Sequence, residues 1–174
     1  IVRYKTLANP QLPEIERYLK YLSFFFVGWC LIWATRTFQC SYVDSGQMAP
    51  IIPKDGMIYY DTRGRFPDAP KLERQKTLLY YHQMIQVGMA FQRRFVGRLI
   101  GLPGDKVALE KGKLKLNGQI IGEEYVRDPG FFRDDFPEIT VPRDHFFLMG
   151  DYRADSGGDS RALGPISAHS VLGI

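Results

Sequence analysis

The chain has 174 residues, a net charge of +4 and a sequence pI of about 9.1. This length fits one domain with a short additional segment and excludes two ordinary domains. Hydrophobic residues make up 45% of the sequence, which excludes a mainly disordered chain. The basic residues are scattered, without zinc-ligand spacing, an RNA-binding aromatic motif or a basic helix. We therefore expect no nucleic-acid partner.

An uncharged apolar run occupies residues 22–34, between Lys20 and Arg36. A helix between these charges would be about 24 Å long, and snorkelling of both side chains would extend it toward a hydrocarbon core of roughly 30 Å. We predict a transmembrane helix at 20–38 after a cytoplasmic segment at 1–19. A cleaved signal peptide is less favoured because no small-residue cleavage site follows. A buried core helix is less favoured because the run is apolar on all sides.

The charges around the apolar run are asymmetric. Four basic residues precede it, namely Arg3, Lys5, Arg17 and Lys20, whereas only Arg36 and then Lys54 follow it. Positive residues flanking a membrane span stay in the cytoplasm. The sequence therefore predicts a single-pass protein of the cytoplasmic membrane, with its N-terminus inside and residues 39–174 on the extracytoplasmic side.

Beyond the apolar run, short apolar segments alternate with turn residues. We predict strands at 57–60, 77–81, 95–100, 106–109, 113–116, 119–121 and 146–149. Asn117-Gly118 lies between two of them and is a strong hairpin signal. Residues 82–91 fit either a helix or a strand, and residues 62–75 are typical of an exposed connection. Many short strands separated by turns indicate an all-β domain built as a barrel or as paired sheets.

Three stretches carry the most specific pattern: Ser45-Gly-Gln-Met-Ala-Pro50, Gly97-Arg-Leu-Ile-Gly-Leu-Pro-Gly-Asp105, and residues 150–161, Gly-Asp-Tyr-Arg-Ala-Asp-Ser-Gly-Gly-Asp-Ser-Arg. Singly, each has an ordinary explanation, such as a tight turn around Pro103. In this order, after one apolar segment, they resemble the bacterial type I signal peptidases (leader peptidases, S26-like). The family pattern reads S-x-S-M-x-P, K-R-x-x-G-x-P-G-D and G-D-N-R-x-x-S-x-D-S-R. The resemblance covers about residues 20 to 174.

The resemblance implies a fold and a chemistry. The fold would be a signal-peptidase-like β-barrel or paired sheets after one transmembrane helix. In the family a serine attacks the peptide carbonyl, and a neutral lysine, its pKa lowered by burial, takes the proton. A second serine hydroxyl and a backbone N–H stabilise the oxyanion. We expect neither a metal nor a cofactor.

Carried over by position, the nucleophile falls on Gln47 and the base on Gly97. A glutamine amide is not a nucleophile, and glycine has no side chain. The register is fixed by matching neighbours: Met48, Pro50, Arg98, Gly101, Pro103, Gly104 and Asp105. The sequence therefore predicts a homologue with no intact catalytic residue.

Other family positions are retained. Ser45 matches the oxyanion serine, and Ser156 matches the serine that supports the lysine. We expect structural roles in the loops for Arg98, Asp105, Asp151, Arg153, Asp159 and Arg161, and a place in the binding groove for Met48 and Pro50. Two departures, Tyr152 in place of the usual Asn and one extra residue at Gly157 or Gly158, put the active geometry of this loop in question.

Three functions are open at this point. The first is a non-catalytic, membrane-anchored homologue that binds or presents exported chains, or assists assembly of surface or membrane structures, because strand addition needs no catalytic pair. Its partners would be membrane lipid and exported polypeptides, and dyad-less relatives are associated with pilus assembly. The second is a structural subunit of a larger membrane complex, with residues 82–95 and the loop 128–133 as candidate contacts.

The third function is an active type I signal peptidase with an unconventional site. In subtilisin, loss of the nucleophile or base costs about 2 × 10⁶ in rate. A replacement base, whether one of the lysines Lys54, Lys76 and Lys106 or one of the histidines His82, His145 and His169, would still require a new nucleophile. The chemistry therefore ranks this function last.

Overall fold

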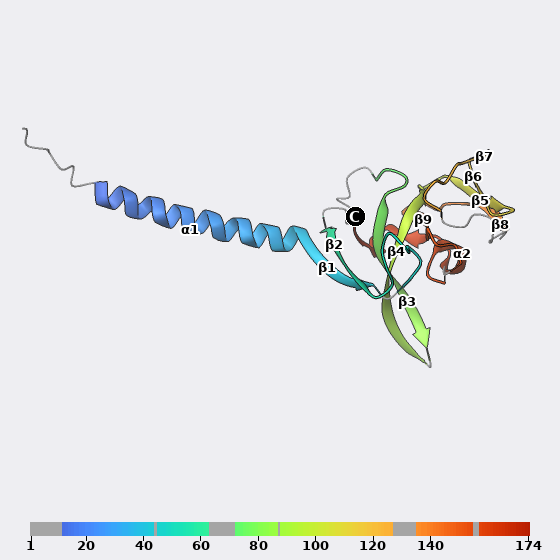
Figure 1. Ribbon diagram of the computed structural model, residues 1–174, viewed down its shortest axis with the longest axis horizontal. Helices are drawn as coiled ribbons and strands as arrows, with labels where there is room; N and C mark the ends of the chain where they lie inside the picture. The colour runs from blue at the N-terminus through green and yellow to red at the C-terminus, as the bar shows by residue number, and fades with distance from the viewer. Residues whose placement is uncertain (1–11, 44, 63–71, 87, 127–134, 155–156) are drawn as a thin grey trace, which may run out of the picture. The chain divides into compact units, whose positions relative to one another are not determined.

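The computed structural model contains the full chain, and the structure describes residues 12–43, 45–62, 72–86, 88–126, 135–154 and 157–174. The chain divides into two units, Ile1–Thr37 and Phe38–Ile174. The first unit holds one long helix, and the second holds the strands (Figure 1). Ser156 and the loop 128–133, both singled out in the sequence, lie outside the described residues.

Helix α1 spans Leu12–Thr37 and begins eight residues before the predicted start. Residues 12–19 contain no glycine, and their one proline lies in the first turn, where its missing N–H would have no partner within the helix. The segment Ile15–Thr37 is long and apolar enough to cross a membrane, with a mean hydropathy of 1.3 and none of its apolar 18-residue window buried. The prediction of one long N-terminal apolar helix is confirmed.

The second unit begins with a two-stranded antiparallel sheet. Strand β1, Phe38–Val43, pairs with β2, Gly56–Asp61. The sequence predicted β2 but extended the helix over the start of β1. Because neither Gly nor Pro stands between residue 34 and Phe38, no turn residue marks the change from helix to strand.

A five-stranded sheet has the order β10-β9-β4-β3-β11. Its strands are β3 (Thr77–Gln86), β4 (Met89–Gly101), β9 (His145–Met149), β10 (Ile166–Ser167) and β11 (Val171–Gly173). Strands β3 and β4 form a long ribbon from the pair Thr77↔Arg98 to the pair Gln86↔Met89 (Figure 1). The ambiguous segment 82–91 is therefore strand on both sides of a turn.

A four-stranded sheet has the order β7-β6-β5-β8. Its strands are β5 (Lys106–Glu110), β6 (Lys113–Leu116), β7 (Gln119–Ile120) and β8 (Phe136–Thr140). Asn117 and Gly118 both have positive φ, 52° and 83°, as the predicted hairpin turn requires. The described part of this unit also contains the short helices α2 (Ser160–Leu163) and η2 (Ala168–Ser170). The all-β fold class predicted from the sequence is confirmed.

Alternation along the central strands divides the core. On β9, Phe146 and Leu148 pack into one cluster, whereas Phe147 and Met149 pack into another against the four-stranded sheet. A third cluster joins the β1–β2 sheet to β3 and β4, and Met48 belongs to it. Successive side chains along β3 and β4 likewise face opposite sides of the sheet.

Candidate functional site

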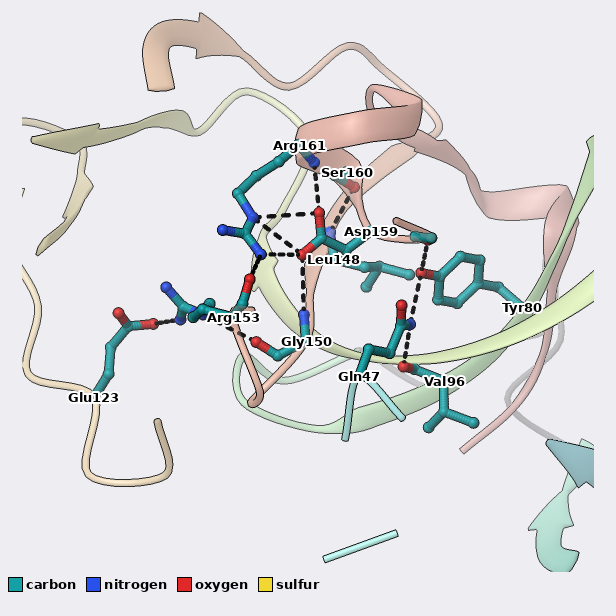
Figure 2. Close-up of polar contacts among 11 residues, drawn as sticks. Gln47, Tyr80, Val96, Glu123, Leu148, Gly150, Arg153, Asp159, Ser160 and Arg161 are labelled. Atoms are coloured by element: carbon teal, nitrogen blue, oxygen red, sulfur yellow. Dashed lines mark hydrogen bonds and ion pairs between the residues drawn. The ribbon is translucent and has the colours of Figure 1, made fainter. Parts of the chain in front are cut away.

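Gln47 is a buried residue whose side chain hydrogen-bonds to the unpaired edge of strand β4. Strand β9 pairs with β4 only from Arg98 onward, so the Val96 carbonyl on that edge needs another partner. The Gln47 side chain supplies it, because its Nε2 donates to the Val96 carbonyl at 2.5 Å and to the Tyr80 hydroxyl at 3.3 Å (Figure 2). Only 1% of Gln47 is exposed.

Gly97 lies on β4 with its missing side chain directed into the core. A Cβ built there would lie 3.2 Å from Cε1 of Tyr80, 3.3 Å from Cβ of Leu148 and 3.5 Å from the Tyr80 hydroxyl. Tyr80 comes from the neighbouring strand β3 and is completely buried. The space beyond Gly97 is therefore filled by the tyrosine ring.

The Tyr80 hydroxyl joins three parts of the site. It accepts from Gln47 and donates to the Gly158 carbonyl at 2.5 Å. Gly158 lies so close to the Phe95 ring that a Cβ there would overlap it, which makes glycine necessary at this point. Burial raises the pKa of Tyr80 well above its usual value near 10, although the Gln47 hydrogen bond opposes the shift. The group is therefore a neutral phenol.

Ser45 lines a small cavity beside this network. The cavity has a volume of about 150 Å³ and is bounded by Ser45, Gly46, Gln47, Lys54, Arg93, Phe95, Gly157 and Gly158. The Ser45 hydroxyl is buried and has no hydrogen-bond partner among the residues that the structure describes. The sequence placed Lys54 only in a nearby turn, whereas the fold brings it to the same cavity.

The loop after β9 is braced by Asp159 and Arg161. The Asp159 carboxylate accepts from the Arg161 guanidinium at 2.9 Å, from the Arg161 backbone N–H at 2.9 Å and from the Gly150 N–H at 3.3 Å (Figure 2). Asp159 also caps α2. The next residue, Ser160, accepts from the Leu148 N–H at 2.9 Å. This loop is thereby tied to the end of β9.

A second ionic network involves Asp151 of the same loop. Arg98 donates to the Asp151 carboxylate from Nε at 2.8 Å, and its guanidinium lies 4.2 Å from the centre of the Tyr125 ring. The bond to Asp151 raises the pKa of Arg98. Burial raises the pKa of Tyr125, with a further contribution from Glu123, to which its hydroxyl donates.

Glu123 links this network to Arg153. The two form a buried ion pair, and Arg153 also donates to the Gly150 carbonyl at 2.9 Å (Figure 2). Neither Glu123 nor Tyr125 was singled out from the sequence, because no motif contains them.

Asp105 belongs to a separate turn. It accepts from the Leu102 N–H at 2.8 Å, from Asn117 Nδ2 at 2.9 Å and from the Arg74 guanidinium. Burial opposes ionisation, but these hydrogen bonds outweigh it and lower the pKa of Asp105. The residue fixes the turn between β4 and β5 and takes no part in the Gln47 site.

Met48 is a correction to the sequence prediction. It was expected to line a binding groove, but only 1% of it is exposed, and it packs with Val43, Tyr60, Leu79 and Val96. A side chain between two sheets cannot line an open groove. Pro50, the other groove candidate, is exposed at the surface.

The sequence-predicted residues thus fall into groups. Gln47 and Gly97 meet around Tyr80, and Ser45 lines the adjoining cavity. Three ion pairs surround them: Arg98 with Asp151, Arg153 with Glu123, and Arg161 with Asp159. Tyr80, which completes the centre, was missed, since its only sequence signal was its place in the predicted strand 77–81.

The family model described as "Signal peptidase, peptidase S26" matches residues 16–174. This chain belongs to the signal peptidase family, peptidase S26. The family predicted from the three motifs is therefore confirmed. Among similar proteins of this signal peptidase family, a probable signal peptidase I-2 from Synechocystis sp. is 29% identical over 79% of this chain and 62% of its own length. A signal peptidase I P from Bacillus subtilis subsp. natto is 34% identical over 46% of this chain and 48% of its own length.

The matched region therefore spans about half to three fifths of the length of these relatives. A crystal structure of a signal peptidase I from Enterococcus faecalis is also similar to this family member. It is 28% identical, with a TM-score of 0.48, and the similarity covers 60% of this chain and 97% of that chain.

Proposed function

We propose that this chain is a membrane-anchored, non-catalytic member of the signal peptidase family that binds extended segments of exported polypeptides. The observation that supports this most is the chemistry around Tyr80. The family nucleophile and base positions carry an amide and a glycine, and a neutral phenol fills the space between them. Proteolysis by a serine requires an activated hydroxyl and a group that takes its proton.

The remaining groups do not supply a substitute pair. The Tyr80 proton is engaged by the Gly158 carbonyl, and the raised pKa keeps it on the phenol. Ser45 provides a hydroxyl, and Lys54 borders the same cavity. Lys54 is exposed, however, whereas a lysine serves as a general base when burial favours its neutral form. An active peptidase is therefore the weaker reading of this site.

A peptide-binding edge lies beside the site. No described strand pairs with the second edge of β4 before Arg98. Because Val96 turns its carbonyl to that edge, alternation directs the backbone groups of Arg94 and Gln92 there as well. Gln47 already occupies Val96, so an added strand would pair with the residues before it.

The anchor supports a role at a membrane surface. Helix α1 has the length and composition of a span, and β1 starts at the residue that follows its last residue. The excess of basic residues before the span favours an N-terminus in the cytoplasm and a β domain on the extracytoplasmic side. Exported chains emerge on that side, which fits them as the partner.

The test uses the full chain in detergent micelles, with fluorescently labelled preprotein segments and an active signal peptidase as positive control. We expect no cleavage, together with saturable binding. Gln92→Pro removes a donor from the β4 edge and should abolish binding. Gln83→Pro is the matched control, because Gln83 faces Gln92 across the ribbon and presents its N–H to the opposite edge. Cleavage by the purified chain, or equal binding by both variants, would contradict the proposal.

A second candidate is a structural subunit of a larger membrane complex. The end of the β3–β4 ribbon favours it, since Ile85, Met89 and Phe91 are exposed there, Ile85 by 79%. Replacing Ile85 and Met89 by threonine should then release partners that co-purify with the tagged chain from its native membrane. If the same partners remain bound, or if none co-purifies, this candidate fails.

A further inference from the structure

The centre of the site has no room for the longer side chain that the base position would carry. At Gly97, the nearest atoms to a built Cβ are Cε1 and the hydroxyl of Tyr80 and Cβ of Leu148, all within 3.5 Å. Distances of 3.2 and 3.3 Å are tighter than ordinary contacts between carbon atoms. A single methyl group at this position already requires its neighbours to move.

Tyr80 cannot easily move away. It is completely buried, and its ring packs against Phe95 with centroids 5.8 Å apart. Its hydroxyl accepts a hydrogen bond from the Gln47 amide and donates one to the Gly158 carbonyl. Rotating the ring out would leave these groups without partners in a buried place, which carries a large penalty.

We infer that Gln47, Tyr80 and Gly97 form one coupled packing unit in which Tyr80 occupies the volume of the missing base. An amine-bearing chain at position 97 fits only after Tyr80 is replaced by a smaller residue. The inference rests on the proposed function for its assignment of position 97. The coupling itself is a property of the fold and is measured without any substrate.

The experiment is a double-mutant cycle on the full chain in detergent. The variants are Gly97→Met, Tyr80→Ala and their combination, since methionine has about the length of lysine without its charge. Both tryptophans, Trp29 and Trp33, lie in α1 and would not report on the β domain. Unfolding by urea is therefore followed by pulse proteolysis of the β domain.

We expect Gly97→Met to lower the stability of the β domain far more when Tyr80 is present than in the chain that already carries Tyr80→Ala. The coupling should change the unfolding equilibrium constant by about tenfold or more. The same methionine combined with Val107→Ala, which makes a cavity in the cluster against the four-stranded sheet, should show additive effects. Additive effects in the Tyr80 cycle would overturn the inference.

A pair of smaller substitutions provides the same test if the larger ones prevent folding. Gly97→Ala with Tyr80→Leu adds one methyl group and removes the outer part of the ring, so the combination should again be more stable than the sum of its single changes predicts. Additivity in this pair as well would rule out coupling. Cleavage of a preprotein by the unmodified chain would instead refute the proposed function and leave the measured coupling unaffected.

Discussion

The hydroxyl of Tyr80 lies 3.3 Å from the side-chain amide nitrogen of Gln47, and the same hydroxyl lies 3.5 Å from the point where a Cβ of residue 97 would stand. One aromatic side chain therefore contacts Gln47 and fills the space beside Gly97, the two residues that we propose stand at the family's nucleophile and base positions. It donates its only proton to Gly158. Hydrogen bonds and packing therefore fix the Tyr80 side chain, and this arrangement has measurable consequences.

Tyr80→Phe should destabilise the β domain by about 1–3 kcal/mol. The variant keeps the ring but leaves the buried Gly158 carbonyl without its donor and removes the acceptor from Gln47. Urea unfolding measures the loss. Tyr59→Phe is the matched control, since Tyr59 is 82% exposed and should change stability by less than about 0.5 kcal/mol. Equal effects of the two variants would show that the Tyr80 hydroxyl contributes nothing.

Alkaline pH should weaken the fold through Tyr80 and Tyr125. Burial raises both pKa values above that of an unfolded tyrosine, near 10. Above about pH 10 the unfolded chain releases these protons while the folded chain retains them, so stability is fully present below that pH and is lost as the pH rises. Unfolding free energies from pH 8 to 11 should therefore fall more steeply in the unmodified chain than in the variant with both residues changed to phenylalanine. Parallel slopes would contradict this prediction.

The double variant Gln47→Ser with Gly97→Lys should not gain peptidase activity. The new lysine would enter the volume that Tyr80 fills, and overpacking a core usually costs about 1–3 kcal/mol. A labelled signal-peptide substrate measures turnover, with an active signal peptidase as positive control. Detectable cleavage by the double variant would show that the site accommodates lysine without a change at Tyr80.

Arg98→Met should cost about 3–5 kcal/mol, because it leaves the Asp151 carboxylate unpaired with only 1% of its side chain exposed. It also removes the guanidinium stacked on Tyr125. Lys106→Met is the comparison, since its ion pair with Glu138 has both side chains at least half exposed and should contribute little. Similar losses in the two variants would argue against a structural role for the Arg98–Asp151 pair.

Local signals in the sequence were sufficient for most of the β domain. Strands such as 57–60 and 113–116 were predictable because turn residues bound them, and Asn117-Gly118 specified its hairpin. Strand β1 was missed because no Gly or Pro separates it from the helix. Strands β10 and β11 were missed because two or three residues carry no measurable period.

The site divides in the same way. The identities of Gln47 and Gly97 were readable in the motifs, because matching neighbours fixed their register. Met48 shares that motif, yet it is a core residue, since only the packing of the β1–β2 sheet on β3 and β4 decides which side of the segment is covered. A motif specifies residue types along the chain and does not specify which of them face solvent.

The sequence by itself determined the family, the all-β class and the long apolar helix, and it supplied Gln47 and Gly97 as the residues on which the proposed function depends. These properties depend on residue type and on spacing along the chain. The tertiary structure decided what surrounds these two residues. Tyr80 is 33 residues from Gln47 and 78 residues from Gly158, so the three meet only when β3, β4 and the loop after β9 pack together.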